Sequence, residues 1–353
     1  MNIEDYGWDE YFARQWKERC AEKMFPGRII ADYGQMLRVT AGQGEYLVNR
    51  PLQKHDNDLQ VAVGDWAALE CDAETGRLSL CFVLPRKTKF FRAASGIAVK
   101  EQIVAANVDY VFLMQSLNRD FNMRRLERYL IASWESGAIP VVVLTKTDCC
   151  GDVGAKKALA CNTAPGVEVH AISCVTGEGM EEVRKYFARG KTIAFLGSSG
   201  VGKSTLANAL AGEDLFKTQT IREHDAKGRH TTTHREIVLL SGGGMILDTP
   251  GMRSLSLWEA DTGMEVMFGD IEELIKLCRF HDCSHNNEPG CAVREALYTG
   301  ALDMQRWNSW LKLQKELAHL EAKKEGRLRL KEKQSGKRIA KLVKEIYKGK
   351  GKR

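Results

Sequence analysis

The chain has 353 residues, which is long enough for two or three domains that each bury a core of their own. Apolar residues make up 44% of it and charged residues 28%, as in ordinary globular proteins, and no stretch approaches the roughly 18 consecutive apolar residues of a membrane span. The acidic N-terminal segment MNIEDYGWDEYFARQW lacks the apolar run of a signal peptide, so we expect a cytoplasmic protein whose ten cysteines stay reduced.

The net charge of +6 is distributed unevenly along the chain. Residues 311–353 carry 16 Lys or Arg and 5 Asp or Glu, a net +11, which leaves −5 for residues 1–310. A basic tail on a neutral-to-acidic body favours a polyanionic partner, most simply nucleic acid, and not a membrane. The alternative for this helical or disordered tail is a role in solubility alone.

Short β-type runs fill residues 26–92 after an N-terminal extension, residues 1–24. The runs are GRIIADY, MLRVT, GEYLVN, DWAALEC and RLSLCFVL, with turn residues between them. Five short strands in this space predict a small closed barrel of the oligonucleotide-binding (OB) type over residues 25–95, although composition does not exclude an SH3-like barrel. The strip Arg86–Arg92 interleaves basic and aromatic residues, which suits either contact with RNA or a solvated barrel edge.

From Asn107 onward, buried-strand runs alternate with helical stretches. The strand runs are VDYVFLMQ, IPVVVLT, VEVHAIS and TIAFLG, and the expected helices are Arg124–Ser136, Asp152–Asn162, Met180–Ala188 and Lys203–Ala211. This alternation predicts an α/β domain with a mostly parallel sheet over residues 96–256. The runs REIVLL and GMILD follow without an intervening helix, so we expect them to pair antiparallel.

A phosphate-binding loop is predicted directly after the TIAFLG strand. Residues Gly197–Ser204 match G-x-x-x-x-G-K-[ST], between a buried strand and a helix. The backbone N–H groups of such a loop converge on phosphates, with Lys203 reaching the β- and γ-phosphates as a catalytic group and the Ser204 hydroxyl binding Mg²⁺. The predicted contacts are Gly197, Ser198, Ser199, Gly200, Val201, Gly202, Lys203, Ser204 and Thr205.

The choice of base requires a second loop. Thr145-Lys146-Thr147-Asp148 ends a buried strand and resembles the [NT]-K-x-D loop that reads guanine. The Asp148 carboxylate can accept hydrogen bonds from both N1–H and N2–H₂ of guanine, whereas adenine offers no donor on that edge. Thr145 stands where Asn is more frequent, which puts one tethering bond in doubt. Ser173-Cys174 follows the next strand, as the loop that meets guanine O6.

Two segments downstream of the phosphate loop fit the switches of a GTP-binding domain. Asp248-Thr249-Pro250-Gly251 matches D-x-x-G, in which Asp248 holds Mg²⁺ through water and the Gly251 N–H senses the γ-phosphate. The polar stretch GRHTTT, residues 228–233, suits switch I, with Thr232 or Thr233 completing the Mg²⁺ shell.

The position after D-x-x-G often carries a glutamine that orients the attacking water, but here it is Met252. Methionine cannot orient water by hydrogen bonding, so slow intrinsic turnover is expected. His230 or a partner could supply the missing group, and the alternative for His230 is simple packing in its loop.

Cys278, Cys283, His285 and Cys291 form the pattern C-x₄-C-x-H-x₅-C. Three thiolates and one imidazole supply a closed tetrahedral shell, as in a structural Zn²⁺ site, and the alternative is reduced cysteines beside a surface histidine. His281 lies in the same loop and could compete as a ligand. The other seven cysteines show no metal spacing and are expected to be buried fillers.

All five elements of a G domain are therefore expected, but the base-reading loops precede the phosphate loop and the switches. Together, this circularly permuted order, GSSGVGKST, GRHTTTH, DTPGM and the cysteine spacing resemble the ribosome small-subunit-dependent GTPase A (RsgA, or YjeQ) family over residues 25 to 310. The resemblance implies an N-terminal OB barrel, a permuted G domain, a helical zinc module over residues 257–310 and the basic tail, residues 311–353.

The resemblance also implies a function. A member of this family would be a GTP hydrolase that acts late in the assembly of the small ribosomal subunit, binds ribosomal RNA and is stimulated by the subunit, and we expect a monomer. One alternative is a nucleic-acid-binding regulator in which the nucleotide is structural. An ATP-using RNA remodelling enzyme is another, and Asp148 argues against it.

Overall fold

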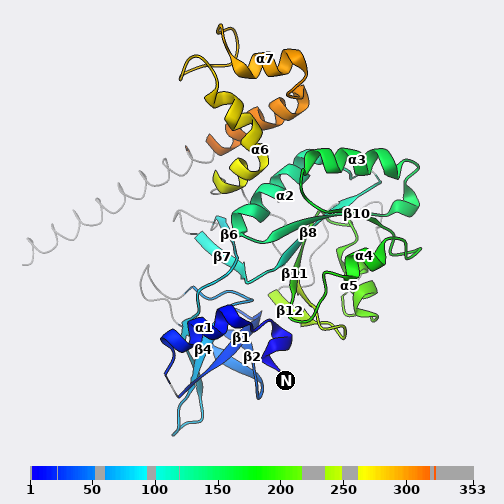
Figure 1. Cartoon of the computed structure of the whole chain (residues 1–353). Helices are drawn as coiled ribbons and strands as arrows, with labels where there is room; N and C mark the ends of the chain where they lie inside the picture. Colours follow the sequence, from blue (N-terminus) through cyan, green and yellow to red (C-terminus); the bar gives the residue numbers. More distant parts are fainter. Residues whose placement is uncertain are drawn as a thin grey trace, which may run out of the picture. The chain divides into compact units, whose positions relative to one another are not determined.

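A computed structural model of the chain describes residues 2–21, 23–51, 60–93, 101–118, 120–216, 235–248, 261–318 and 322. The chain forms two compact units. The first comprises residues 1–91, 103–255 and 261–267, and the second comprises residues 92–102, 256–260 and 268–353. Figure 1 shows the strands and helices of the chain.

The first unit begins with a helical segment that the sequence analysis does not foresee. It contains the 3₁₀ turn η1 (Ile3–Tyr6) and helix α1 (Glu10–Arg19), which is capped by the Asp9 carboxylate. Phe12 on α1 is buried, and the rings of Phe12 and Trp8 lie 5.9 Å and 4.8 Å from the ring of Trp66. These aromatic contacts anchor α1 to the strands that follow.

Five antiparallel strands follow, and they are the five that the sequence predicts. They are β1 (Met24–Asp32), β2 (Met36–Ala41), β3 (Gly44–Asn49), β4 (Trp66–Cys71) and β5 (Leu78–Val83). Hydrogen bonds connect them in the order β3-β2-β1-β4-β5. Their shared core consists of Ile29, Leu37, Val39, Val48, Val61, Ala67, Leu69 and Leu80.

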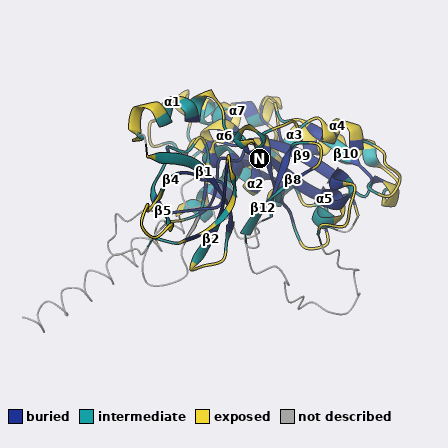
Figure 2. Cartoon of the chain, turned by 90° about the horizontal axis from the view of Figure 1, so that it is seen from below, coloured by how far each residue is buried: buried dark blue, intermediate teal, exposed yellow. Residues whose placement is uncertain are grey.

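The second half of this unit is a six-stranded sheet in the order β10-β9-β8-β11-β13-β12. Its strands are β8 (Tyr110–Ser116), β9 (Ile139–Thr145), β10 (Val169–Ile172), β11 (Thr192–Leu196), β12 (Arg235–Leu239) and β13 (Met245–Asp248). Neighbours pair in parallel except β12 and β13, which are antiparallel as predicted. Figure 2 shows β8 and β9 as a buried layer.

Helices cover both faces of this sheet. They are α2 (Met123–Ser136), α3 (Val153–Thr163), α4 (Met180–Arg184) and α5 (Lys203–Ala211). Helices α4 and α5 share one core with Phe112, Met114, Val141 and Val143, whereas α2 and α3 cover the opposite face (Figure 1). The arrangement is a doubly wound α/β fold, and α4 is shorter than the expected 180–188.

The two halves of the first unit are joined by a strand pairing. Strand β1 pairs antiparallel with β12, with Ala31 opposite Glu236 and Asp32 opposite Arg235. The five-stranded and six-stranded parts therefore form one hydrogen-bonded sheet. A further short pair, β6 (Lys89–Ala93) with β7 (Glu101–Ala106), stands apart from it.

Arg28 on β1 lies at the same junction and is only 1% exposed. Its guanidinium donates to the carbonyl oxygens of Tyr6, Gly64 (3.4 Å) and Asn107 (3.0 Å), and to Thr192 Oγ1 (2.9 Å). Burial lowers the pKa of Arg28 to about 10, so the group stays charged at neutral pH. One buried cation thus links the N-terminal turn, the five antiparallel strands and the parallel sheet.

The second unit is helical. Helix α6 (Asp261–Lys276) is kinked at Phe268, and only its part from Phe268 onward belongs to this unit. Helix α7 is Ala292–Thr299, and residues 304–318 are also helical. Cys291 caps α7, with its Sγ accepting from the backbone N–H of Arg294 at 3.4 Å. Among the residues that the structure describes, no helix combines the length and apolarity needed to cross a membrane.

Candidate functional site

The predicted nucleotide-binding residues gather at one edge of the parallel sheet. The carboxyl ends of β10, β9, β8, β11 and β13 point the same way, because these strands are parallel. Residues 145–148 follow β9, residues 173–174 follow β10, Gly197–Ser204 follows β11, and Asp248 ends β13. In a doubly wound sheet this edge is where ligands bind.

The glycine loop has the backbone that its motif requires. Gly200 and Gly202 have φ angles of +74° and +105°, which side-chain-bearing residues rarely adopt. A Cβ on Gly197 would lie 2.9 Å from the Val201 side chain and 3.0 Å from the Met114 carbonyl oxygen, so only glycine fits there. Helix α5 begins at Lys203, directly after Gly202. The N–H groups of its first turn have no acceptor within the helix, so they can bind an anion at the helix N-terminus.

Hydrogen bonds from polar side chains stabilise this loop. The Lys203 ammonium donates to the carbonyl oxygens of Gly197 (2.8 Å) and Ser198 (2.6 Å). The Ser198 hydroxyl donates to the carboxylate of Asp120, which also accepts from Arg125 at 2.9 Å. The sequence analysis does not name Asp120, although its place four residues beyond β8, at the carboxyl edge of the sheet, was a usable signal.

The base-reading loop is attached directly to the phosphate loop. Thr145 is 2% exposed, and its hydroxyl donates to the carbonyl oxygen of Val201 at 2.6 Å. Lys146 has a φ of +62°, and its ammonium donates to the carbonyl oxygen of Gly200 at 2.8 Å. The threonine hydroxyl therefore provides the tether that the absence of asparagine had put in doubt.

Asp148 presents its carboxylate to solvent at this edge. Its Oδ1 accepts from the Ser173 hydroxyl at 2.6 Å and its Oδ2 from the Cys149 thiol at 3.2 Å. These two hydrogen bonds, that from Ser173 above all, lower the pKa of Asp148 below its ordinary value of 3.8. Asp148 is therefore ionised at neutral pH.

The second loop of the base site is stabilised by the same serine. Ser173 Oγ accepts from the backbone N–H groups of Val175 and Thr176, both at 3.2 Å. Glu178 ties the two loops together, since it accepts from the Thr147 hydroxyl at 3.0 Å. Residues 145–148 and 173–174 thus form one connected surface.

The predicted switch residues are described only in part. Asp248 ends β13 and lies directly opposite Glu236 on β12. His230, Thr232, Thr233, Gly251 and Met252 lie outside the described residues.

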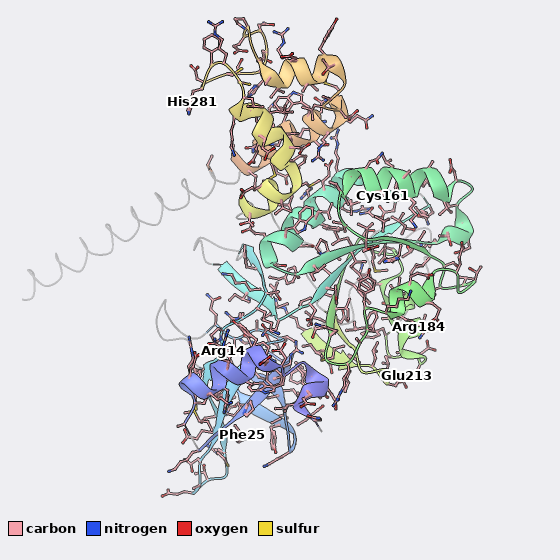
Figure 3. The ribbon with its side chains drawn as sticks, viewed as in Figure 1. Arg14, Phe25, Cys161, Arg184, Glu213 and His281 are labelled. Carbon is pink, nitrogen blue, oxygen red and sulfur yellow. The ribbon has the colours of Figure 1, made fainter. Side chains whose placement is uncertain are left out.

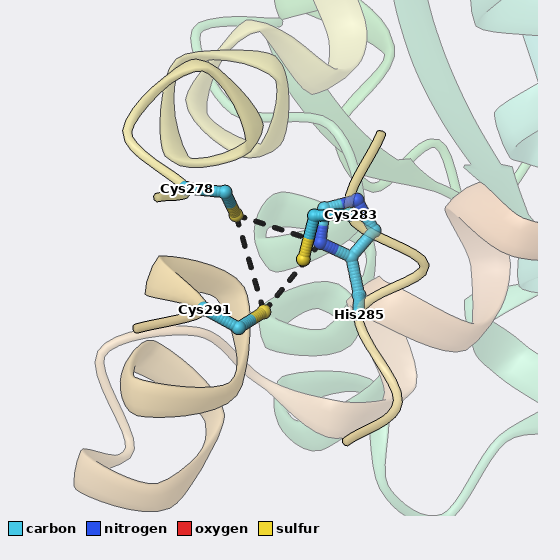
Figure 4. Close-up of side chains that lie close together, drawn as sticks. All are labelled: Cys278, Cys283, His285 and Cys291. Atoms are coloured by element: carbon cyan, nitrogen blue, oxygen red, sulfur yellow. Dashed lines mark hydrogen bonds between the residues drawn. The ribbon is translucent and has the colours of Figure 1, made fainter. Parts of the chain in front are cut away.

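The Cys278–Cys283–His285–Cys291 cluster brings its four ligand atoms within 4.8 Å of one another. The sulfurs of Cys278 and Cys291 are 3.9 Å apart, and His285 Nδ1 lies 3.6 Å and 3.5 Å from them (Figure 4). Tetrahedral zinc, with Zn–S of about 2.3 Å and Zn–N of about 2.05 Å, would place sulfurs about 3.8 Å apart and sulfur and nitrogen about 3.6 Å apart. The donor set fits a zinc ion in both chemistry and spacing.

The surroundings orient this cluster. The ring of Trp307 meets that of His285 edge-on, with centroids 5.6 Å apart, and stacks on Trp310 at 4.9 Å. Partial desolvation and the neighbouring sulfurs raise the pKa of Cys283 to about 11. A bound cation would favour its thiolate instead.

The structure tests two further predictions, one about His281 and one about the cysteines outside the cluster. His281 is not a member of the cluster; it is exposed, and Figure 3 shows it at the outer edge of its loop. The view of the other cysteines as buried fillers was wrong, because Cys71, Cys149 and Cys161 are exposed and Cys149 contacts Asp148.

Part of the basic and aromatic strip at residues 86–92 is used inside the fold. Arg86 donates to the buried Asp65 carboxylate at 2.6 Å and 2.8 Å, and Phe90 is only 2% exposed. Lys87 pairs with Asp9 and lies 5.0 Å from the ring centre of Phe12. Phe90 cannot stack on a base in this arrangement, because its ring is part of the core.

Comparison with known proteins identifies the family. The model of the RsgA GTPase family matches residues 83–258. The chain is 41% identical over 359 residues to a protein of Listeria innocua named "Small ribosomal subunit biogenesis GTPase RsgA 1", which covers 100% of both chains. The chain belongs to the RsgA GTPase family.

Solved structures agree with this assignment. YjeQ from Thermotoga maritima is 26% identical, with a TM-score of 0.61, over 84% of this RsgA family chain and 99% of its own. YloQ, described as a circularly permuted GTPase, shares the fold with a TM-score of 0.59 at 23% identity, over 85% and 98% of the two chains. The order of β9, β10 and β11 in this chain is accordingly the permuted order.

Proposed function

We propose that this RsgA family member is a GTP hydrolase that takes part in the assembly of the small ribosomal subunit in the cytoplasm. The observation that carries the proposal is the hydrogen bonding of Thr145 and Lys146 to the phosphate loop, at 2.6 Å and 2.8 Å. These two hydrogen bonds connect the loop proposed to recognise guanine with the loop proposed to bind phosphate, at one edge of the sheet. The name of the Listeria innocua relative supplies the ribosomal context.

GTP would lie across this edge. The backbone N–H groups of residues 197–205 and the Lys203 ammonium would bind the phosphates, and Asp148 would accept from guanine N1–H and N2–H₂. The backbone at Ser173 and Cys174 would meet guanine O6, and the Lys146 stem would cover the purine ring. The ionised, hydrogen-bonded state of Asp148 supports this assignment.

Magnesium would be held by oxygen atoms, which are the ligands that it prefers. The hydroxyl of Ser204 and the carboxylate of Asp248 suit it, together with Thr232 or Thr233. The bound ion would neutralise phosphate charge during transfer. Zinc would be structural, held by Cys278, Cys283, His285 and Cys291, because three thiolates and one imidazole leave no open position.

Hydrolysis requires a water oriented towards the γ-phosphate. Gly251 would contact that phosphate, Met252 cannot orient the water, and we assign this task to His230. His230→Ala should then reduce the turnover stimulated by small subunits by at least about tenfold, with nucleotide affinity unchanged. Stimulated turnover at the wild-type rate would remove His230 from the mechanism.

We further propose that β1–β5 form an OB-type barrel over residues 25–95. The order β3-β2-β1-β4-β5 and the close approach of β3 to β5 suit a five-stranded closed barrel. The proposed N-terminal extension is 1–24, the G domain 96–256, the zinc module 257–310 and the basic tail 311–353. Barrel, module and tail would contact ribosomal RNA, with the protein acting as a monomer.

The experiment compares GTP turnover with small subunits, large subunits, naked RNA and no addition. The proposal expects strong stimulation by small subunits alone. GTP binding without hydrolysis in all four conditions would instead favour a regulator in which the nucleotide is structural. An Asp148→Asn variant should shift preference from guanosine to xanthosine nucleotides, and unchanged base preference would contradict the assignment of this pocket.

A further inference from the structure

A row of four residues crosses the joint between the barrel strands and the parallel sheet. Arg38 on β2 lies opposite Ala31 on β1, Ala31 lies opposite Glu236 on β12, and Glu236 lies opposite Asp248 on β13. Residues directly opposite one another in a ladder project to the same face of the sheet. The row therefore ends at the carboxylate that we assign to magnesium.

The last two members of this row are both acidic. Side chains directly opposite in an antiparallel pair have Cβ atoms about 4.5–5.5 Å apart, and like charges in that position repel. An uncompensated Glu236 would therefore repel the Asp248 carboxylate and compete with it for a cation.

Arg38 supplies the compensating charge. Its guanidinium pairs with the Glu236 carboxylate, and its Nε lies 3.7 Å from Glu45 on β3. Ala31 stands between Arg38 and Glu236, and its methyl group is small enough for the long arginine side chain to cross over it. All three charged side chains are half-buried, at 29%, 37% and 33% exposure for Arg38, Glu236 and Glu45, so solvent screens the pair only in part.

We propose that Arg38 is a positioning residue for the magnesium site: by pairing with Glu236 across Ala31, it draws this carboxylate away from Asp248 and fixes β12 beside β1. The inference rests on the proposed role of Asp248. It makes the barrel a contributor to the nucleotide site, because the charge that balances Glu236 comes from β2. Along the chain, β12 begins at Arg235, two residues after Thr233, so the strand that Arg38 contacts directly follows the segment assigned to switch I.

The test measures GTP hydrolysis and binding of a fluorescent GTP analogue as functions of Mg²⁺ concentration. Arg38→Gln should raise the Mg²⁺ concentration for half-maximal effect roughly two- to fivefold, the range expected from one like-charged cross-strand pair. Arg38→Lys should retain most of the wild-type response. Glu236→Gln in the Arg38→Gln background should restore it, because the repelling charge is then gone.

Arg50→Gln is the matched control. Arg50 pairs with Asp32 at 2.6 Å and is exposed to a similar extent, 26%, but its pair does not border Asp248. The Arg50→Gln variant should leave the Mg²⁺ response unchanged. Thermal unfolding of all variants separates a loss of stability from a change at the site, since a purely structural role would lower the melting temperature without moving the Mg²⁺ response.

The Asp248→Asn variant distinguishes a failure of the proposed magnesium site from a failure of the proposed role of Arg38. If it leaves the Mg²⁺ response at the wild-type level, the proposed magnesium site is wrong. If Asp248→Asn shifts the response but Arg38→Gln does not, or if Glu236→Gln fails to rescue Arg38→Gln, the role of Arg38 is overturned while the magnesium site stands.

Discussion

The ammonium group of Lys146 donates a hydrogen bond to the carbonyl oxygen of Gly200 at 2.8 Å, although 54 residues separate the two in the chain. Lys146 follows β9 and Gly200 follows β11, with β8 between these strands in the sheet. The permuted order therefore leaves the pocket intact, because parallel strands deliver their loops to one edge in whichever order the chain visits them. The permutation changes which strand comes last, so that β13, which ends at Asp248, is the last strand of this sheet along the described part of the chain.

The contact between the two loops predicts how mutations act on nucleotide affinity. Lys146→Ala removes a charged hydrogen bond and should weaken binding of a fluorescent GTP analogue by at least about tenfold. Thr145→Val keeps the shape but leaves the Val201 carbonyl without its donor, and should also weaken binding, whereas Thr145→Asn should retain it. Thr163→Val, which removes a hydroxyl bonded within α3, serves as the control. Equal affinities for Lys146→Ala and Thr163→Val would contradict the role of the contact.

The pKa of Asp148 predicts the acid limit of guanine binding. Because the pKa is depressed in the folded chain, the carboxylate stays ionised above it, and recognition is lost only as the pH falls through that lowered value. Ser173→Ala removes the largest cause of the depression, so its binding of GTP should fail at a higher pH than that of the wild type. Cys149→Ala should produce a smaller shift in the same direction.

The measurement is GTP affinity between about pH 3 and pH 7, with Asp148 ionisation followed by NMR. Ser79→Ala, whose hydroxyl bonds to the Glu70 carbonyl oxygen on the distant strand pair, should behave as the wild type. An unchanged acid midpoint in Ser173→Ala would show that Ser173 does not set the charge of Asp148.

Much of this site could be predicted from sequence, because the signals are local. The glycines of the phosphate loop, the buried runs before it and the acid after β9 each carry their own pattern, and the strand ends bring them together. The cysteine spacing, together with the family resemblance, likewise predicted the Cys278–Cys283–His285–Cys291 cluster. Strands β1–β5 were readable from their apolar runs and turns.

What sequence could not predict are the pairings between distant segments. Nothing local in Ala31 or Glu236 indicates that β1 and β12 are neighbours, and Asp120 reveals its contact with Ser198 only in three dimensions. The burial of Phe90 was equally unreadable, because alternation in a strand can turn an aromatic residue inward as easily as outward.

Arg28 predicts a large effect on stability. Its guanidinium donates to buried acceptors from four segments. The Gly64 carbonyl oxygen also accepts from the Asn107 side-chain amide at 2.9 Å, but truncation of Arg28 would remove the donor to the other three acceptors, at a cost of about 1–3 kcal/mol each. Arg28→Met should lower the melting temperature by roughly ten degrees. Arg184→Lys, at an exposed ion pair within α4, should change it by no more than about two degrees. Similar melting temperatures for the two variants would rule out a structural role for Arg28.

The zinc cluster predicts a loss of structure confined to the second unit. Cys291→Ser keeps a side-chain oxygen that can cap α7 but removes one thiolate, and binding of a structural zinc can contribute about 10 kcal/mol to folding. The variant should lose one zinc per chain, and its residues 268–318 should exchange amide hydrogens rapidly. The first unit should exchange as in the wild type, because its core of β8–β11 lies outside the cluster.

Two controls sharpen this experiment. His281→Ala removes an exposed histidine of the same loop, and Cys161→Ser removes an exposed thiol of α3; both should keep one zinc and normal exchange. Zinc retention should also fall on acidification, because protons compete for the three thiolates and the imidazole. Full zinc content in Cys291→Ser would exclude a Cys₃His site, and zinc loss in His281→Ala would show that this histidine binds the metal in place of His285.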